Sequence, residues 1–168
     1  MKKVVLSLSL LLVLLLTACG IKSQDFDQMV DNLIDASVPL VYPDSLFSWL
    51  KTEPNLVILD AREKEEYDIS HLQNAIWVGY DGFNLENLKI GTDKEIVVYC
   101  SVGYRSEKIG KKLENAGYKN VSNLHGGIFD WVNHGYPIVD DKEKSTVKIH
   151  PYSNSWGKWL TKGEKAYE

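Results

Sequence analysis

Two short apolar segments constrain the fold of this chain more than any other feature. Leu56–Leu59 is a continuous run of strand-forming residues, and Glu95–Cys100 is a second run that ends at a cysteine. Uninterrupted apolar runs of this length predict strands buried on both faces, as in a parallel sheet. Helix-like segments alternate with these strands at short spacing. The pattern therefore predicts an α/β domain with a mainly parallel sheet.

The remaining elements are predicted from local patterns. Residues 24–36 carry an apolar stripe at i, i+3, i+4, i+7 and i+8, which predicts an amphipathic helix that packs on the domain or spaces it from a membrane. The segment from Tyr104 to Ala116 has the same kind of periodicity and is followed by Gly117, a typical helix stop. Further helices are expected from residue 43, at 63–67, at 84–88 and after residue 127, and further strands at 75–78 and 121–124.

Composition excludes several classes of protein. The 168 residues hold 19 Lys and Arg against 23 Asp and Glu, a net charge of −4, with 44% hydrophobic residues. These values are ordinary for a globular protein, and only two arginines are present, so no nucleic-acid partner is expected. The two cysteines, Cys19 and Cys100, exclude a disulfide framework, and no metal site is expected. His125, His134 and His150 have no metal-binding or catalytic residues around them in the sequence, so we expect each to be ordinary.

The first residues predict a targeting signal that is not part of the folded domain. Lys2 and Lys3 precede an apolar run, Val4–Leu16, that is too short to span a bilayer. The following Leu-Thr-Ala-Cys, ending at Cys19, resembles the bacterial lipoprotein lipobox. We therefore expect residues 1–18 to be a lipoprotein signal peptide and residues 19–37 to hold the lipidated Cys19 and an amphipathic helix or linker. The alternative is an ordinary secretory signal with a chance cysteine.

This targeting signal predicts a protein that is anchored by lipid to a membrane of the bacterial cell envelope, outside the cytosol. Lipidation would block Cys19 and leave Cys100 as a free thiol in an oxidising compartment. Such a thiol is a liability unless it is buried or used.

Cys100 lies where a buried strand runs directly into a helix. Ligands bind beyond the carboxyl ends of strands in open α/β sheets. The turn and the helix start direct backbone N–H groups and a positive dipole end to one place, which favours a thiolate. Gly103 permits an unusual backbone conformation, and Arg105 supplies a positive charge for an anionic substrate. Alternatively Cys100 is a buried structural cysteine.

Four stretches of this chain resemble the boxes of the rhodanese-like sulfurtransferases. Leu59-Asp60-Ala61-Arg62-Glu63 with Glu66-Tyr67 is similar to the first box, and residues 70–75 are similar to the second. Ser70 there stands for the usual glycine, and Gln73-Asn74 stands for Pro-Gly. Cys100–Ser106 matches the active loop Cys-x-x-Gly-x-Arg-Ser of single-domain members, and residues 124–127 with Trp131, Gly135 and Pro137 resemble the closing box.

The resemblance implies an open, mainly parallel sheet flanked by helices on both faces, within residues 38–140, followed by a C-terminal tail at 141–168. It also implies sulfur transfer through a persulfide on Cys100, with thiosulfate or a persulfide as donor and a thiol or cyanide as acceptor, and without a cofactor. Arg105 would orient the donor, and Asp60 would line the pocket. Arg62, Glu66 and His71 are expected to be structural. The amides that hold the sulfur would come from Ser101, Val102, Gly103, Tyr104 and Arg105.

Two other functions stay open at this point. Cysteine-dependent phosphatases and arsenate reductases place five residues between Cys and Arg, whereas this loop has four, which suits one sulfur atom better than a tetrahedral oxyanion. A non-catalytic rhodanese-like binding module is the second alternative, although both Cys100 and Arg105 are retained. We expect a monomer, with a tail containing Trp156 and Trp159 that packs on the domain or is partly disordered. The alternative is a tail that contacts a partner or lies at the membrane surface.

Overall fold

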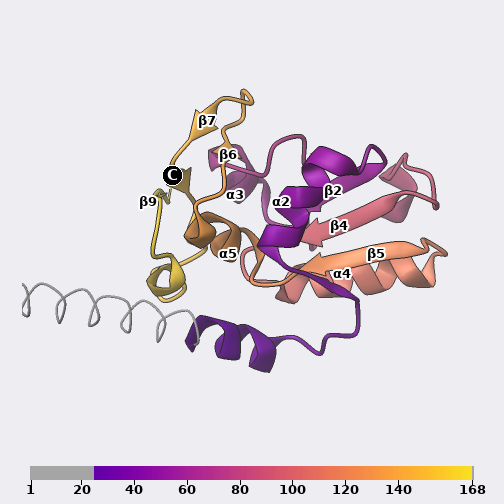
Figure 1. The fold of residues 1–168 in the computed structure, drawn as a ribbon, viewed down its shortest axis with the longest axis horizontal. Helices are drawn as coiled ribbons and strands as arrows, with labels where there is room; N and C mark the ends of the chain where they lie inside the picture. The colour runs from indigo at the N-terminus through magenta and orange to yellow at the C-terminus, as the bar shows by residue number, and fades with distance from the viewer. Residues whose placement is uncertain (1–24, 168) are drawn as a thin grey trace, which may run out of the picture.

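A central parallel sheet organises the molecule. The computed structural model describes residues 25–167, and the predicted signal peptide 1–18 and Cys19 lie outside this range. The sheet has the order β1-β5-β4-β2-β3, and every neighbouring pair of its strands is parallel, which confirms the predicted fold class (Figure 1). Its strands are β1 (Leu40–Val41), β2 (Leu56–Asp60), β3 (Ile76–Trp77), β4 (Glu95–Tyr99) and β5 (Asn120–Leu124).

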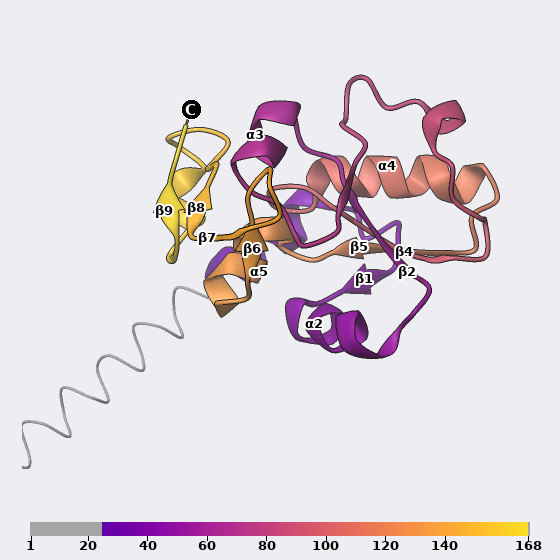
Figure 2. The same cartoon turned by 90° about the horizontal axis from the view of Figure 1, so that it is seen from above.

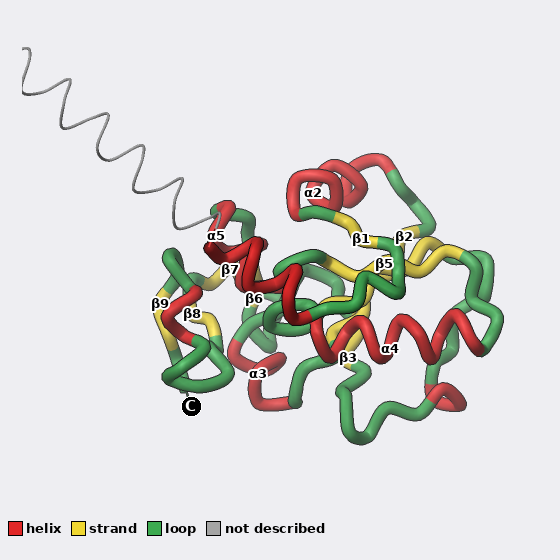
Figure 3. Tube along the Cα trace, turned by 90° about the horizontal axis from the view of Figure 1, so that it is seen from below, coloured by secondary structure: helices red, strands yellow, loops and turns green. Residues whose placement is uncertain are grey.

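Helices cover both faces of the sheet. Figures 2 and 3 show α4 (Tyr104–Asn115) on one side and α2 (Pro43–Thr52) on the other. Successive side chains of β4 point to opposite faces of the sheet, so this strand packs against both helix layers. Ile96 and Val98 belong to the cluster on the α4 face, and Val97 and Tyr99 belong to the cluster on the other face. The shorter helices are α3 (Lys64–Ile69), α5 (Gly127–His134) and two 3₁₀ turns, η1 (Leu85–Asn87) and η2 (Gly157–Trp159).

The predicted amphipathic helix is present before the sheet. Residues 25–33 are helical, and the apolar stripe is buried through Phe26, Val30 and Ile34. The stripe packs on the same core cluster as α5, so this helix is part of the folded domain. No helix within residues 25–167 is both long and apolar enough to span a membrane.

The C-terminal tail is folded back onto the domain. Its strand β7 (Ser145–Thr146) pairs antiparallel with β6 (Ile138–Val139), which lies just before the tail, and within the tail β8 (Lys148–Ile149) pairs parallel with β9 (Glu164–Lys165). Ile149 and Leu160 are buried in the main core, and the Trp159 ring lies 5.8 Å from the Phe26 ring of the N-terminal helix. The structure therefore shows the predicted packing of the tail on the domain. Sequence periodicity missed these strands because each has only two residues.

Candidate active site

Cys100 lies in the loop between β4 and α4, as predicted. Its side chain is 1% exposed. Gly103 precedes α4 with a φ of +109°, a left-handed conformation that a side chain would strain. The Gly103 N–H donates to Cys100 Sγ at 3.2 Å. The loop is therefore turned back on its own cysteine.

Two buried polar side chains, Ser106 and Asn123, hold this loop in place. The Ser106 hydroxyl donates to Asn123 Oδ1 at 2.7 Å and lies 3.5 Å from Cys100 Sγ. The Asn123 amide in turn donates to the Gly103 carbonyl at 2.9 Å. The role of Asn123 was not predicted from the sequence, although an asparagine inside a strand pattern is a signal, since asparagine is depleted in strands.

The start of α5 fixes the orientation of the loop peptides. The N–H of Ile128 donates to the Cys100 carbonyl at 2.9 Å, and that of Phe129 donates to the Ser101 carbonyl at 3.1 Å. Because the N–H and C=O of a trans peptide point in opposite directions, this turns the N–H groups of Ser101 and Val102 away from α5. Within residues 25–167, the N–H groups of Val102, Tyr104 and Arg105 have no protein acceptor. Unpaired donors at a helix start are suited to an anion.

Arg105 is clamped by an acidic partner. Its guanidinium donates to Glu66 at 2.7 and 2.9 Å and to Ser101 Oγ at 2.9 Å, and Ser101 Oγ donates to Glu66. Burial alone would raise the pKa of Glu66, but Arg105 and Arg62 hold that pKa below its ordinary value. Burial likewise lowers the pKa of Arg105, and Glu66 together with the Cys100 charge raises it overall. Both groups of the pair are therefore ionised, and Glu66 supports the active loop directly.

Asp60 is placed differently from the expectation. It is fully buried, and its carboxylate accepts hydrogen bonds from Arg62 at 2.7 to 3.1 Å and from the Tyr99 hydroxyl. It does not line the pocket around Cys100. The physical reason is charge compensation, because the equally buried Arg62 needs an anion beside it. Asp60 is therefore part of a structural ion pair rather than of the substrate surface.

His71 lies at a distance from this pocket, in a structural setting. Its imidazole is 1% exposed and stacks on Tyr67 with ring centroids 3.8 Å apart. One ring nitrogen lies 3.0 Å from the Tyr67 carbonyl oxygen, and the other lies 3.1 Å from a Glu143 carboxylate oxygen. These contacts agree with the expectation that His71 bonds nearby backbone.

A pocket of about 570 Å³ opens over Cys100. The C-terminal tail contributes Tyr152 and Trp156 to its wall, and the Arg105 guanidinium lies 5.0 Å from the Tyr152 ring centroid. Two carboxylates, Glu63 and Asp81, also line it. None of these four residues was predicted from the sequence to line the pocket. The other lining residues are Leu33, Tyr80, Cys100, Ser101, Val102, Tyr104 and Arg105.

Comparison with known proteins agrees with this geometry. The sequence profile of the rhodanese-like domain matches residues 43–134. The chain belongs to the rhodanese-like family. Among solved structures, the rhodanese-like domain of an Anabaena protein superposes with a TM-score of 0.56 at 26% identity, covering 61% of this chain and 79% of that one.

Curated relatives of this rhodanese-like chain have two kinds of names. A thiosulfate:glutathione sulfurtransferase from Saccharomyces cerevisiae is 37% identical over 103 residues, which are 54% of this chain and 74% of that protein. A tRNA uridine(34) hydroxylase from Streptococcus suis is 34% identical over 115 residues, covering 65% of this chain. The match spans only 35% of that hydroxylase, so the likeness concerns one part of the longer protein. Together these relatives support a function related to sulfur transfer.

Proposed function

We propose that this protein is a sulfurtransferase that carries sulfur as a persulfide on Cys100. In the first step the Cys100 thiolate attacks the outer sulfur of a sulfane donor. A new S–S bond forms at Cys100 while the donor's own bond breaks, and the donor leaves as sulfite or as a thiolate. In the second step a thiol, as thiolate, or cyanide attacks the terminal sulfur, and the Cys100 thiolate is released.

The observation that carries this proposal is the set of backbone N–H groups around Cys100. The Gly103 amide already donates to Sγ, and α5 turns the neighbouring Ser101 and Val102 amides away from itself. Fixed dipoles of this kind stabilise an anionic terminal sulfur without reorganising during the reaction. The sulfur remains covalently bound throughout, so the mechanism requires no cofactor.

The charges of the pocket favour a donor with little net negative charge. Arg105 is the cation of the pocket wall, and Glu66 neutralises it at 2.7 Å, while Glu63 lies farther from it at 3.7 Å. Glu63 and Asp81 then leave the wall with an acidic excess. Burial, and in part Asp81, raises the pKa of Glu63. A dianion such as thiosulfate is disfavoured electrostatically, and the aromatic rings of Tyr152 and Trp156 suit the organic part of a persulfide.

A mass measurement tests the reaction. After incubation with a donor and removal of excess reagent, the protein should gain about 32 Da, the mass of one sulfur atom, and Cys100→Ser should gain none. A thiol acceptor should then remove the added mass. A protein that never gains sulfur from thiosulfate, a polysulfide or an organic persulfide would contradict the proposal. Inertness with an intact fold would favour a binding module, and hydrolysis of phosphate esters without sulfur gain would favour a phosphatase.

We also propose that the protein acts at the bacterial cell envelope through lipid on Cys19. The support is the apolar run Val4–Leu16 followed by the lipobox-like residues. In cells fed a labelled fatty acid, the wild-type protein should be labelled and fractionate with membranes, and Cys19→Ser should not be labelled. Equal labelling of both proteins would contradict the anchor and leave the reaction at Cys100 unaffected.

A further inference from the structure

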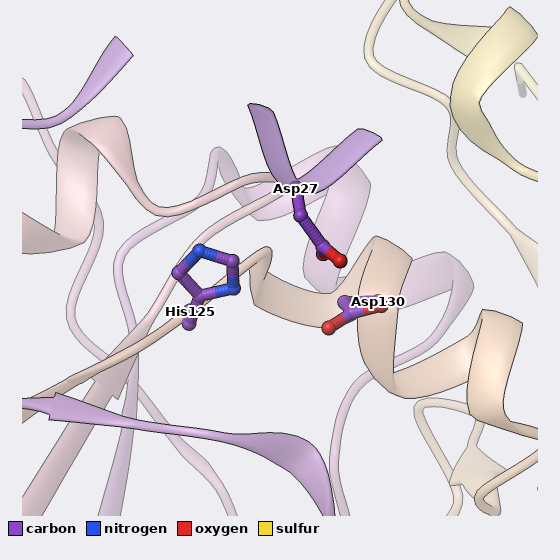
Figure 4. A group of neighbouring side chains, drawn as sticks. All are labelled: Asp27, His125 and Asp130. Atoms are coloured by element: carbon purple, nitrogen blue, oxygen red, sulfur yellow. The ribbon is translucent and has the colours of Figure 1, made fainter. Parts of the chain in front are cut away.

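A second cluster of chemically active side chains lies away from the pocket over Cys100. Asp27 comes from the N-terminal helix (residues 25–33), His125 follows β5, and Asp130 belongs to α5 (Figure 4). One potential ligand atom from each of these residues lies within 4.8 Å of those from the other two. Three separate segments of the chain therefore bring two carboxylates and an imidazole to one place.

His125 is the residue that distinguishes this cluster from an ordinary acidic surface. It is 2% exposed, and its Nε2 lies 3.1 Å from an Asp31 carboxylate oxygen. Its Nδ1 is buried and has no hydrogen-bond partner among the described residues. In Figure 4 the ring edge that carries Nδ1 faces the side chains of Asp27 and Asp130. A buried polar atom without a partner costs free energy, so a ligand bound at Nδ1 would be favourable.

The charges around the ring specify what kind of ligand fits. In the tautomer in which Asp31 accepts the Nε2–H, Nδ1 presents its lone pair to the cluster. That lone pair then faces two carboxylates, and all three groups are electron donors. His134 Nδ1 lies 3.2 Å from one oxygen of Asp130, but it contacts neither Asp27 nor His125 in this cluster. The cluster is therefore short of positive charge.

We propose that Asp27, His125 Nδ1 and Asp130 bind a divalent transition-metal ion of the Zn²⁺ class. One nitrogen and two oxygen donors suit such an ion, whereas Ca²⁺ and Mg²⁺ prefer oxygen ligands alone. Asp31 is the positioning residue, since a carboxylate on the second ring nitrogen is the usual support of a metal-bound histidine. This proposal reverses the expectations that the chain has no metal site and that His125 is ordinary.

Such an ion would join the N-terminal helix to α5 and to the residue that follows β5. Asp27 lies on the helix that also carries Leu33, a residue of the pocket wall over Cys100. His125 and Asp130 flank the Gly126–Gly127 turn, which leads into the α5 amides that hold the active loop. The site is therefore structural in character and is connected to the active loop through the start of α5.

Calorimetric titration of the purified full chain with Zn²⁺ tests this proposal. The protein should carry no polyhistidine tag, should first be freed of metal with a chelator, and should contain Cys100→Ser so that the active thiol binds no zinc. We expect one equivalent to bind, and Asp27→Asn to weaken binding at least about tenfold. Asp25→Asn is the matched control, because it removes an exposed carboxylate of the same helix outside the cluster, and its affinity should equal that of the parent.

Two further measurements keep the result unambiguous. Far-ultraviolet circular dichroism checks that Asp27→Asn is folded, which is expected because Asp27 is exposed. Nitrogen-15 shifts of His125 should move at Nδ1 when Zn²⁺ is added. Absence of stoichiometric binding, equal affinity of the two aspartate variants, a metal-insensitive Nδ1, or tighter binding of Ca²⁺ than of Zn²⁺ would each overturn the proposal. None of these outcomes depends on sulfur transfer.

Discussion

Gly127 offers the sharpest test of how the active loop is held. This residue adopts a φ of +55° at the start of α5. A Cβ built there would lie 2.3 Å from the Cys100 carbonyl oxygen and 2.7 Å from the Ser101 carbonyl carbon. Both neighbours are backbone atoms of the loop that carries the nucleophile. Alanine at this position must therefore move either the loop or the first turn of α5.

The size of that movement follows from the contact distances. Real Cβ atoms essentially never approach other atoms within 3.0 Å and rarely within 3.4 Å, so the Cys100 carbonyl must move by about 0.7 to 1.1 Å relative to Gly127. A misplacement of about 1 Å at a reacting group costs about 100-fold in rate. The left-handed backbone adds about 1 kcal/mol of instability, because alanine is strained there and glycine is not.

The assay compares Gly127→Ala with Gly117→Ala. Gly117 has a φ of +93° but nothing within 4 Å of a built Cβ, so its alanine variant carries the backbone strain without the collision. Both variants should lose similar stability from strain, and only Gly127→Ala should lose about 100-fold in kcat/KM for sulfur transfer, measured on protein shown to be folded by thermal melting. If Gly127→Ala keeps the activity of the Gly117→Ala control, then α5 does not position the cysteine loop as we argue.

Other predictions concern the clamp, the tail and the rim of the pocket. Glu66→Gln should lower the free energy of unfolding by about 3 kcal/mol near neutral pH. Because the pKa of Glu66 is held below its ordinary value of 4.5, the wild type should lose this advantage as pH falls below that value. Equal pH profiles of the two proteins in denaturant titrations would contradict the pairing. Tyr152→Ala should speed the alkylation of Cys100 by iodoacetamide several-fold, and an unchanged rate would show that the tail does not cover the thiol. The double variant Glu63→Gln, Asp81→Asn should raise kcat/KM for thiosulfate about tenfold at low salt and leave kcat/KM for an uncharged persulfide nearly constant. Equal changes in kcat/KM for the two donors would contradict the charge argument.

The sequence predicted the parts of this structure that depend on neighbouring residues. Strands β2 and β4, helix α4 and the Cys100 loop each carry their signal within a short window: an apolar run, a helical stripe, or a glycine beside a cysteine. Buried parallel strands are especially easy to predict from the sequence because both of their faces are apolar. The order of these local elements was enough to predict the fold class.

Contacts between distant segments were not predictable in this way. Asn123 supports the Gly103 carbonyl from another strand, and Tyr152 reaches the pocket from a tail whose strands have two residues each. No local periodicity encodes such contacts. The error at Asp60 has a related cause, since its position at the end of a strand suggested the pocket, and only the buried Arg62 beside it explains why it turns inward.

The pairing of Arg105 changes the interpretation of the whole active loop. From the sequence, this arginine was the cation expected to receive an anionic donor. In the structure its guanidinium is already bound by Glu66 and Ser101, and the net charge of that group with Glu66 is zero. The positive potential near Cys100 must therefore come mainly from backbone N–H groups and the start of α4, which the contacts of α5 hold in place. Such dipoles act over short distances and favour one anionic sulfur atom at the loop over a diffuse dianion at the pocket entrance.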